Sequence, residues 1–175
     1  MNPGTSSEKR VAIVDGLLQE LEQEAQTTRR VLERVPNEHL GWRPHEKGRT
    51  LGELSWHIAT VPGNIAELAL KPTAQVKNIP ESSPAHASEL IPVLDQSVSK
   101  AKSLLHGMDD ATLNSTWRLM NGEREILAMP RAALLRTVML NHWYHHRGQL
   151  STYLRALGQP VPSIYGSSAD ENPFL

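Results

Sequence analysis

The sequence predicts an all-α fold, an up-and-down bundle of four helices with long loops, in a single domain that spans residues 1–175. Apolar residues recur at steps of three and four in four long stretches, which is the period of a helix with one buried face. The 175 residues are enough for one domain with its own hydrophobic core and few for two. Four such helices bury their apolar faces against one another.

The first helix is expected from about Ser6 to Val35. Thr5 and Glu8 have the spacing of a capping box, and Pro36 ends the helix because proline has no backbone N–H to continue it. The apolar positions of this stretch are Val14, Leu18, Leu21, Ala25, Leu32 and Val35. The polar stretch that follows contains proline and glycine without a helical period, which indicates a loop.

A second helix begins after Thr50, which forms another capping box with Glu53. Its apolar stripe consists of Leu51, Leu54, Ile58, Val61, Ile65 and Leu68. Pro62 lies inside this run and should kink or divide the helix. An irregular connection over residues 71–84 leads to a third helix, which begins at about Leu90 and closes at Gly107.

The segment between the third and the last helix contains Asn121 and Gly122, a pair typical of hairpin turns, so a small β-hairpin is expected there. The last helix should run from about Pro130 to Leu157, with Gly158 as its stop. The residues after Pro160 are rich in turn formers and should fold back over the bundle as an irregular tail.

Charge and composition exclude several classes of function. The 18 basic and 19 acidic residues give a net charge of -1, and no run of like charges marks a surface for nucleic acid or for membranes. No apolar stretch is long enough to span a bilayer, and the first residues lack the order of a secretory signal, so a soluble, cytoplasmic protein is expected. Cysteine is absent, so any metal must be bound by nitrogen and oxygen atoms.

Three histidines stand within five positions of the last helix. At about 100° per residue, His142 and His146 share a face with Leu135, Val138, Gln149 and Tyr153, and this face should point into the bundle. His145 lies about 60° to the side of His142, while Trp143, Tyr144 and Arg147 turn progressively away. On the second helix, His57 lies in the apolar stripe and also faces inward.

A single inward histidine is commonly a core residue whose ring nitrogens have hydrogen-bond partners. Three inward rings need many partners, and one divalent cation satisfies all three at once. The pair at positions i and i+4 follows the logic of HExxH sites, but Trp143 replaces the glutamate that serves such peptidases as a general base. An alternative in which His145 replaces a ligand is disfavoured because its side chain points in another direction.

Polar residues near the three histidines are candidates for contacts with the ligand rings or with a substrate. Glu53, Asn64 and Gln149 lie one or two turns from a histidine on nearly the same face. Glu53 has the competing role of completing the helix cap, and the two amides have the competing role of filling polar gaps. Tyr153 lies two turns beyond His146 and offers a hydroxyl either to a substrate or to the bundle end.

The segments "LGELSWHI" and "HWYHHRGQLSTYLRALGQPVPSIYGSSADE" resemble the DinB family of four-helix bundle proteins, and the resemblance covers essentially the whole chain. It implies that His57, His142 and His146 bind one divalent metal ion. Zinc or nickel is the first expectation, with manganese or iron as alternatives. It also implies a small-molecule substrate and frequent homodimers.

The resemblance leaves the reaction open between a metal-dependent hydrolase and a thiol S-transferase that uses a low-molecular-weight thiol such as bacillithiol or mycothiol. The alternative is a metal-binding stress-response protein without turnover, a sensor or a carrier. A third reading makes the histidines purely structural. No basic cluster for the carboxylates of a thiol stands out, because Arg43, Arg147 and Arg155 are scattered, and Arg147 is expected at solvent or at an interface.

Two further expectations concern packing. Trp56 and Trp143 flank the histidines in the sequence and either wall the pocket or pack against another helix or subunit. Gly52 and Gly148 lie inside helices and away from the histidines. A glycine there costs about 1 kcal/mol relative to alanine, so a close approach of helices, within the chain or across a dimer, is expected to compensate.

Overall fold

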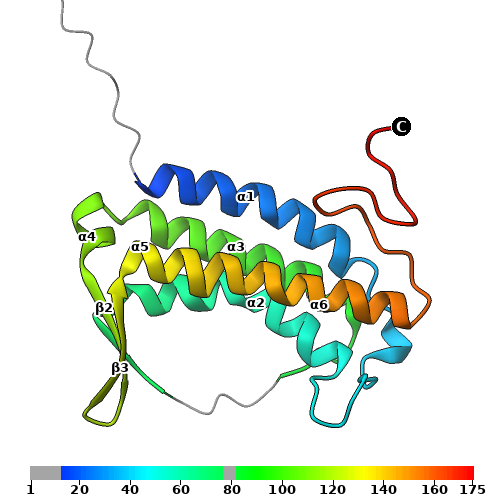
Figure 1. The fold of residues 1–175 in the computed structure, drawn as a ribbon, viewed down its shortest axis with the longest axis horizontal. Coiled ribbons are helices and arrows are strands. Elements are labelled where there is room, and N and C mark those ends of the chain that lie inside the picture. Colours follow the sequence, from blue (N-terminus) through cyan, green and yellow to red (C-terminus); the bar gives the residue numbers. More distant parts are fainter. Residues whose placement is uncertain (1–12, 77–81) are drawn as a thin grey trace, which may run out of the picture.

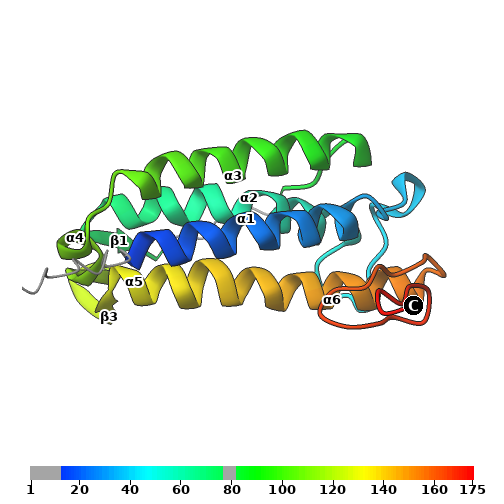
Figure 2. The ribbon, with the colours of Figure 1, turned by 90° about the horizontal axis from the view of Figure 1, so that it is seen from above.

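The structure is a computed structural model that describes residues 13–76 and 82–175. Three long helices, α1 (Ile13–Leu32), α2 (Leu51–Leu70) and α3 (Leu90–His106), pack with a fourth over residues 131–156, and Figures 1 and 2 show all four side by side. The predicted helical bundle is therefore confirmed. The predicted start of the first helix at Ser6 lies outside the described residues.

The predicted up-and-down order is wrong, because two consecutive helices run in the same direction. Gly63 N–H donates to Ser97 Oγ at 2.9 Å, and Lys100 pairs with Glu67, so residue numbers rise together along α2 and α3 and the two helices are parallel. Figures 1 and 2 show that α1 and the helix over residues 131–156 both run the opposite way. The end of α2 and the start of α3 therefore lie at opposite ends of the bundle.

Helix α2 begins as the sequence predicts. Thr50 Oγ1 accepts a hydrogen bond from Glu53 N–H at 3.1 Å, and Glu53 Oε2 accepts one from Thr50 N–H at 2.7 Å. Pro62 does not divide the helix, which continues to Leu70. Helix α3 ends before Gly107 as expected, whereas α1 ends at Leu32, earlier than the predicted Val35.

The last long helix is continuous but not uniform. It starts as α5 (Arg131–Leu134), widens into the π-helical segment η3 (Leu135–Asn141) and continues as α6 (His142–Ala156). A π-helical segment forms i to i+5 hydrogen bonds and so inserts extra backbone into a turn. Its last residue directly precedes His142, so it sets the direction in which the histidines point. Gly158, with φ of 71°, closes the helix as predicted.

A small three-stranded sheet lies at one end of the bundle (Figure 1). The predicted hairpin consists of β2 (Thr116–Asn121) and β3 (Arg124–Pro130). Gly122, with φ of 60°, takes the first position of its two-residue turn, where a positive φ is required. The third strand, β1 (Thr73–Gln75), pairs in parallel with β2 and was not predicted. Because the strand is so short, it has no period that could distinguish it from a loop.

Short helical turns connect the main elements, namely η1 (Asn37–His39), η2 (Ala87–Glu89) and α4 (Asp110–Asn114). The tail folds back over the ends of α1 and α6 as expected, because Glu171 pairs with Arg30 and Asp170 with Arg155. None of the helices in the described parts of the chain combines the length and the apolar character that crossing a membrane requires.

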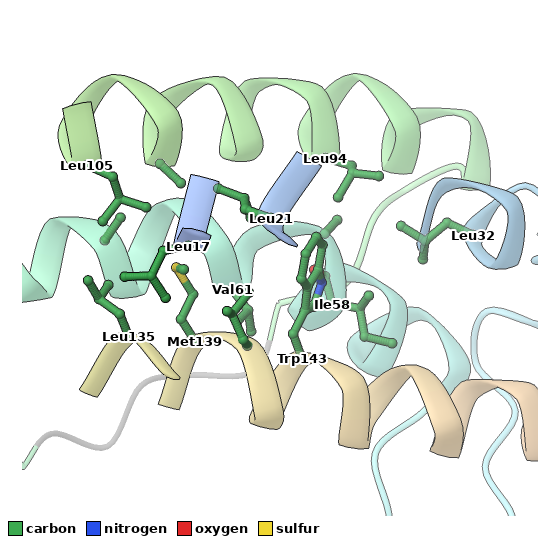
Figure 3. Packing of buried hydrophobic residues seen from close by; sticks show 14 of the residues in the cluster. Leu17, Leu21, Leu32, Ile58, Val61, Leu94, Leu105, Leu135, Met139 and Trp143 are labelled. Carbon is green, nitrogen blue, oxygen red and sulfur yellow. The ribbon is translucent and has the colours of Figure 1, made fainter. Parts of the chain in front are cut away.

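The hydrophobic core lies along the axis of the bundle and receives side chains from every long helix (Figure 3). The labelled residues are Leu17, Leu21 and Leu32 of α1, Ile58 and Val61 of α2, Leu94 and Leu105 of α3, and Leu135, Met139 and Trp143 of the last helix. At Gly63 the parallel helices α2 and α3 come so close that a Cβ would lie 3.0 Å from Ser97 O.

Candidate metal centre

Three histidine rings from two helices meet at the side of the core. His57 comes from α2, and His142 and His146 come from successive turns of α6. Their ring centroids lie 5.2 Å (57 to 142), 4.6 Å (57 to 146) and 4.3 Å (142 to 146) apart, and each pair of rings is nearly perpendicular. One ring nitrogen from each residue lies within 4.8 Å of the others. This three-histidine cluster suggests a metal site.

Within the cluster, His57 Nε2 lies 2.9 Å from His142 Nε2. Two imidazole nitrogens at this distance share one proton as donor and acceptor, or both direct their lone pairs at a cation between the rings. Imidazole nitrogens ligate zinc and neighbouring transition metals readily. The chemistry of the donor set therefore fits a divalent transition metal.

His146 has the ring orientation of a ligand. Its Nδ1 lies 2.6 Å from Gln149 Oε1, and because a carbonyl oxygen only accepts, the proton of the neutral ring is on Nδ1. The lone pair is then on Nε2, which is buried and has no hydrogen-bond partner among the described residues. A buried acceptor without a partner costs free energy. A metal ion bound at Nε2 would remove that cost.

The surroundings favour the neutral form of His142 and His146. The pKa of His146 is lowered to about 4, chiefly by burial; the hydrogen bond with Gln149 acts against this, and the nearby charges of His142, Arg49 and His145 add to it. Burial also lowers the pKa of His142, with smaller contributions from Arg49 and His145. Neutral imidazole is the form that binds metal, so both rings are ready to ligate at neutral pH.

A pocket of about 260 Å³ opens beside His57 and His142. Its remaining lining residues are Arg49, Glu53, Trp56, Thr60, Val61, Asn64, Ile65 and Ser82. His146, which is buried, is not among the lining residues. Arg49 was not predicted as a site residue, although its position directly before the cap residue Thr50 places it at the same end of α2 as Glu53.

The polar residues predicted near the cluster have different surroundings. Glu53 and Asn64 line the pocket, and Glu53 also completes the cap of α2. Gln149 contacts His146 as described above. Tyr153 O–H donates to the backbone oxygen of Arg49 at 3.3 Å and so ties the loop before α2 to α6.

His145 and Trp56 lie beside the three-histidine cluster, as expected, and are not part of it. The side chain of His145 is exposed, and the residue is not part of the group whose nitrogens converge. Its ring packs edge-on against His146, with the centroids 5.1 Å apart. Trp56 is half-buried and lines the pocket.

The core-facing side of the last helix differs from the prediction. Trp143 and Arg147, which were expected to turn away, are both almost completely buried. Core residues recur here at steps of four, from Leu135 through Met139 to Trp143 and Arg147. A regular α-helix with 3.6 residues per turn would drift away from the core at such steps. The π-helical segment corrects the drift, which a prediction from the α-helical period could not include.

Arg147 is buried because its charge is neutralised. Its guanidinium Nη2 lies 2.6 Å from Glu24 Oε2 of α1, and Nη1 donates to Thr28 Oγ1 at 3.1 Å. The group also lies over the rings of Tyr144 and Tyr165, and Nη2 donates to the Tyr165 hydroxyl at 2.5 Å. The predicted position at solvent or at an interface is therefore wrong. This network attaches the tail to the core, because Tyr165 of the tail bonds to Glu24 of α1 and to Arg147 of α6.

The two glycines singled out in the sequence do not mediate a close approach of helices within the described parts of the chain. A Cβ at Gly52 would meet Leu40 O at 3.1 Å and the Ser83 side chain, so this glycine accommodates loops. Gly148 is exposed, and a Cβ there would have no neighbour within 4 Å. The glycine that allows close helix packing is Gly63, next to Pro62.

Comparisons with known proteins agree with this architecture. The model of the DinB family matches residues 7–172. The protein YrdA of Bacillus subtilis strain 168 is 27% identical over 161 residues, which cover 90% of this chain and 91% of YrdA. The crystal structure of a DinB-like protein from Bacillus cereus, also 27% identical, has a TM-score of 0.67 and covers 86% of this chain and 97% of that one.

A further solved structure has the same fold at lower identity. YfiT from Bacillus subtilis is 17% identical with a TM-score of 0.63, and the match covers 91% of this chain and 95% of YfiT. YfiT is described as a probable metal-dependent hydrolase with an unusual four-helix bundle topology.

Proposed function

The chain belongs to the DinB family, and from this membership and its three-histidine cluster we propose that it is a metal-dependent enzyme that hydrolyses a small molecule. The observation that carries the proposal is the buried Nε2 of His146, which has no hydrogen-bond partner among the described residues and belongs to a cluster of converging ring nitrogens. The description of YfiT as a probable metal-dependent hydrolase supports the class of reaction.

In this proposal His57, His142 and His146 hold one divalent ion, with zinc or nickel as the first candidates and manganese or iron as alternatives. When bound, such an ion lowers the pKa of a coordinated water and polarises a substrate oxygen. All three ligands are neutral, so the protein does not offset the charge of the ion. Gln149 holds the His146 ring in the tautomer that leaves Nε2 free.

Glu53 is the candidate proton acceptor. It is the only carboxylate among the described residues that line the pocket. Its Oε2 is engaged with Thr50 N–H in the helix cap, which fixes the side chain in one orientation. We therefore assign proton transfer to Oε1. Replacing Glu53 by Gln keeps a side chain that can complete a capping box and removes the negative charge, so metal binding and fold should be retained while turnover falls.

The pocket suits a small substrate with both apolar and polar parts. Trp56 and Ile65 supply apolar surface, and Arg49 supplies a cation near the histidines. A cation at this place also favours a second candidate, a thiol S-transferase, because low-molecular-weight thiols such as bacillithiol carry carboxylates that a guanidinium binds well.

The test uses protein stripped of metal with a chelator and reloaded with zinc, nickel or manganese. Hydrolysis is measured on a panel of small esters and amides, and thiol transfer is measured on electrophiles with bacillithiol, mycothiol or glutathione. Metal-dependent hydrolysis that is lost in Glu53→Gln supports the proposal. Turnover only with a thiol supports the transferase. Metal binding without any turnover favours the sensor or carrier reading.

A further inference from the structure

A hydrogen bond between two helices lies directly beside the histidine cluster. Trp143 is completely buried, and its indole Nε1–H donates to the backbone oxygen of Ile58 at 2.8 Å. Trp143 follows His142 in α6, and Ile58 follows His57 in α2. Figure 3 shows the Trp143 ring pointing from the last helix toward α2, beside Ile58. The bond therefore joins the two helices one residue away from two of the three rings.

The acceptor is available because of a proline. In an α-helix the oxygen of Ile58 would accept a hydrogen bond from the N–H of residue 62, but Pro62 has no N–H. The helix thus contains a carbonyl in its buried interior that its own backbone cannot satisfy. A buried acceptor without a partner is costly, and the Trp143 indole supplies the missing donor from the neighbouring helix.

This connection has a direct consequence for the cluster. His57 Nε2 and His142 Nε2 lie 2.9 Å apart, and their separation depends on how far apart the backbones of α2 and α6 are at this level and how they are aligned along the bundle. A hydrogen bond from a side chain of one helix to the backbone of the other restricts both. The Ile58 side chain packs in the same core, so the backbone there has little freedom to move.

We propose that Trp143 is a positioning residue for the metal centre, because its bond to the carbonyl that Pro62 leaves unpaired holds α2 and α6 at the separation that lets His57 and His142 bind one ion. This inference rests on the proposed function, since it requires a metal at the three histidines. The proposal also explains why a proline lies inside a continuous helix, because Pro62 leaves the Ile58 carbonyl available to Trp143.

The experiment titrates metal-free protein with Co²⁺ and records the visible absorption bands, which report both affinity and the geometry of the ligands. Trp143→Phe keeps an aromatic ring in the core and removes the donor. Loss of a partner that orients a metal site lowers affinity by about 10- to 100-fold, and we expect a loss in that range with a changed spectrum. Trp117→Phe is the matched control, because Trp117 is also buried and its indole nitrogen has no hydrogen-bond partner among the described residues.

A double variant separates positioning from stability. In Trp143→Phe with Pro62→Ala, the new backbone N–H at position 62 can bond to Ile58 O, so thermal stability should recover. The link between the helices is still absent, so Co²⁺ affinity should remain low. If affinity returns together with stability, Trp143 serves only the fold and the proposal is overturned. If Trp143→Phe alone does not fold, the double variant still shows whether Co²⁺ affinity depends on the bond between the helices.

The outcomes distinguish this inference from the function on which it rests. Wild-type protein that binds no Co²⁺ overturns the metal centre and the positioning role with it. Wild-type protein that binds Co²⁺, together with a Trp143→Phe variant of equal affinity and unchanged spectrum, overturns the positioning role alone.

Discussion

The buried pair of Arg147 and Glu24 provides a quantitative test of the packing beside the cluster. The side chains are 1% and 9% exposed, and the guanidinium lies 2.6 Å from the carboxylate. Replacing Glu24 by Gln keeps the shape and removes the negative charge. The guanidinium is then left in the core with neutral partners only, chiefly Thr28 Oγ1 and the Tyr165 hydroxyl.

Removing one partner of a buried ion pair costs about 3–5 kcal/mol, because the remaining charge is not compensated. The neutral acceptors around Arg147 keep part of its hydrogen bonding, so we expect the lower end, about 3 kcal/mol. This is a large share of the 5–15 kcal/mol that stabilises a typical domain. If the free energy of unfolding falls by about 2 kcal/mol per molar urea, the urea midpoint of unfolding should fall by roughly 1.5 M.

The assay is urea unfolding followed by far-ultraviolet circular dichroism, with Glu67→Gln as the control. Glu67 pairs with Lys100 on the surface, where its side chain is 57% exposed, and breaking such a pair costs under about 1 kcal/mol. If Glu24→Gln lowers the midpoint no more than Glu67→Gln does, Arg147 does not depend on its partner, and the account of its burial is wrong.

Three further predictions concern the site and the helices. Replacing Gln149 by Leu should weaken metal binding by about 10- to 100-fold, because the His146 tautomer is no longer fixed; calorimetric titration with Zn²⁺ would show it, and unchanged affinity would count against the contact. Because burial lowers the pKa of His146 to about 4, the unfolded chain takes up this proton at a higher pH than the folded chain. The stability due to this ring should therefore be complete above about pH 6.5 and be lost as pH falls toward 4. The difference in urea midpoint between wild type and His146→Gln, measured at each pH, reports this contribution. A wild type that gains stability relative to His146→Gln as pH falls would contradict the prediction. Gly63→Ala should destabilise the protein by about 1–3 kcal/mol, since a Cβ there would press on α3. In contrast, Gly148→Ala should stabilise it by up to about 1 kcal/mol, since the site is open. If the two substitutions shift the melting temperature in the same direction, these two predictions are refuted.

Much of the fold could be predicted from the sequence because it depends on local signals. The capping box of Thr50 and Glu53, the stop at Gly158 and the turn at Gly122 each act through the backbone of a few neighbouring residues. The parallel direction of α2 and α3 has no such signal. It depends on the long connection between them, and β1 within that connection is too short to show a period.

The three ligand candidates could be selected from the sequence because they share a helical face or an apolar stripe. The residues of the last helix that face the core could not be predicted correctly, because the π-helical segment before His142 shifts which residues face inward. The burial of Arg147 depends on Glu24, a partner that is distant in the sequence. The bond from Trp143 to Ile58 depends on Pro62 in the same way, since only the assembled helices show which donor meets the unpaired carbonyl.

The central claim is that His57, His142 and His146 bind one divalent metal ion per chain. The most direct test is metal content by mass spectrometry after chelation and reloading, on wild type and on the single alanine variants of these residues and of His145. We expect about one ion per chain in the wild type and in His145→Ala, and a strong loss in the other three. The assignment of these ligands would be wrong if His145→Ala abolished loading while His142→Ala or His146→Ala retained it, or if none of the four changes affected metal content.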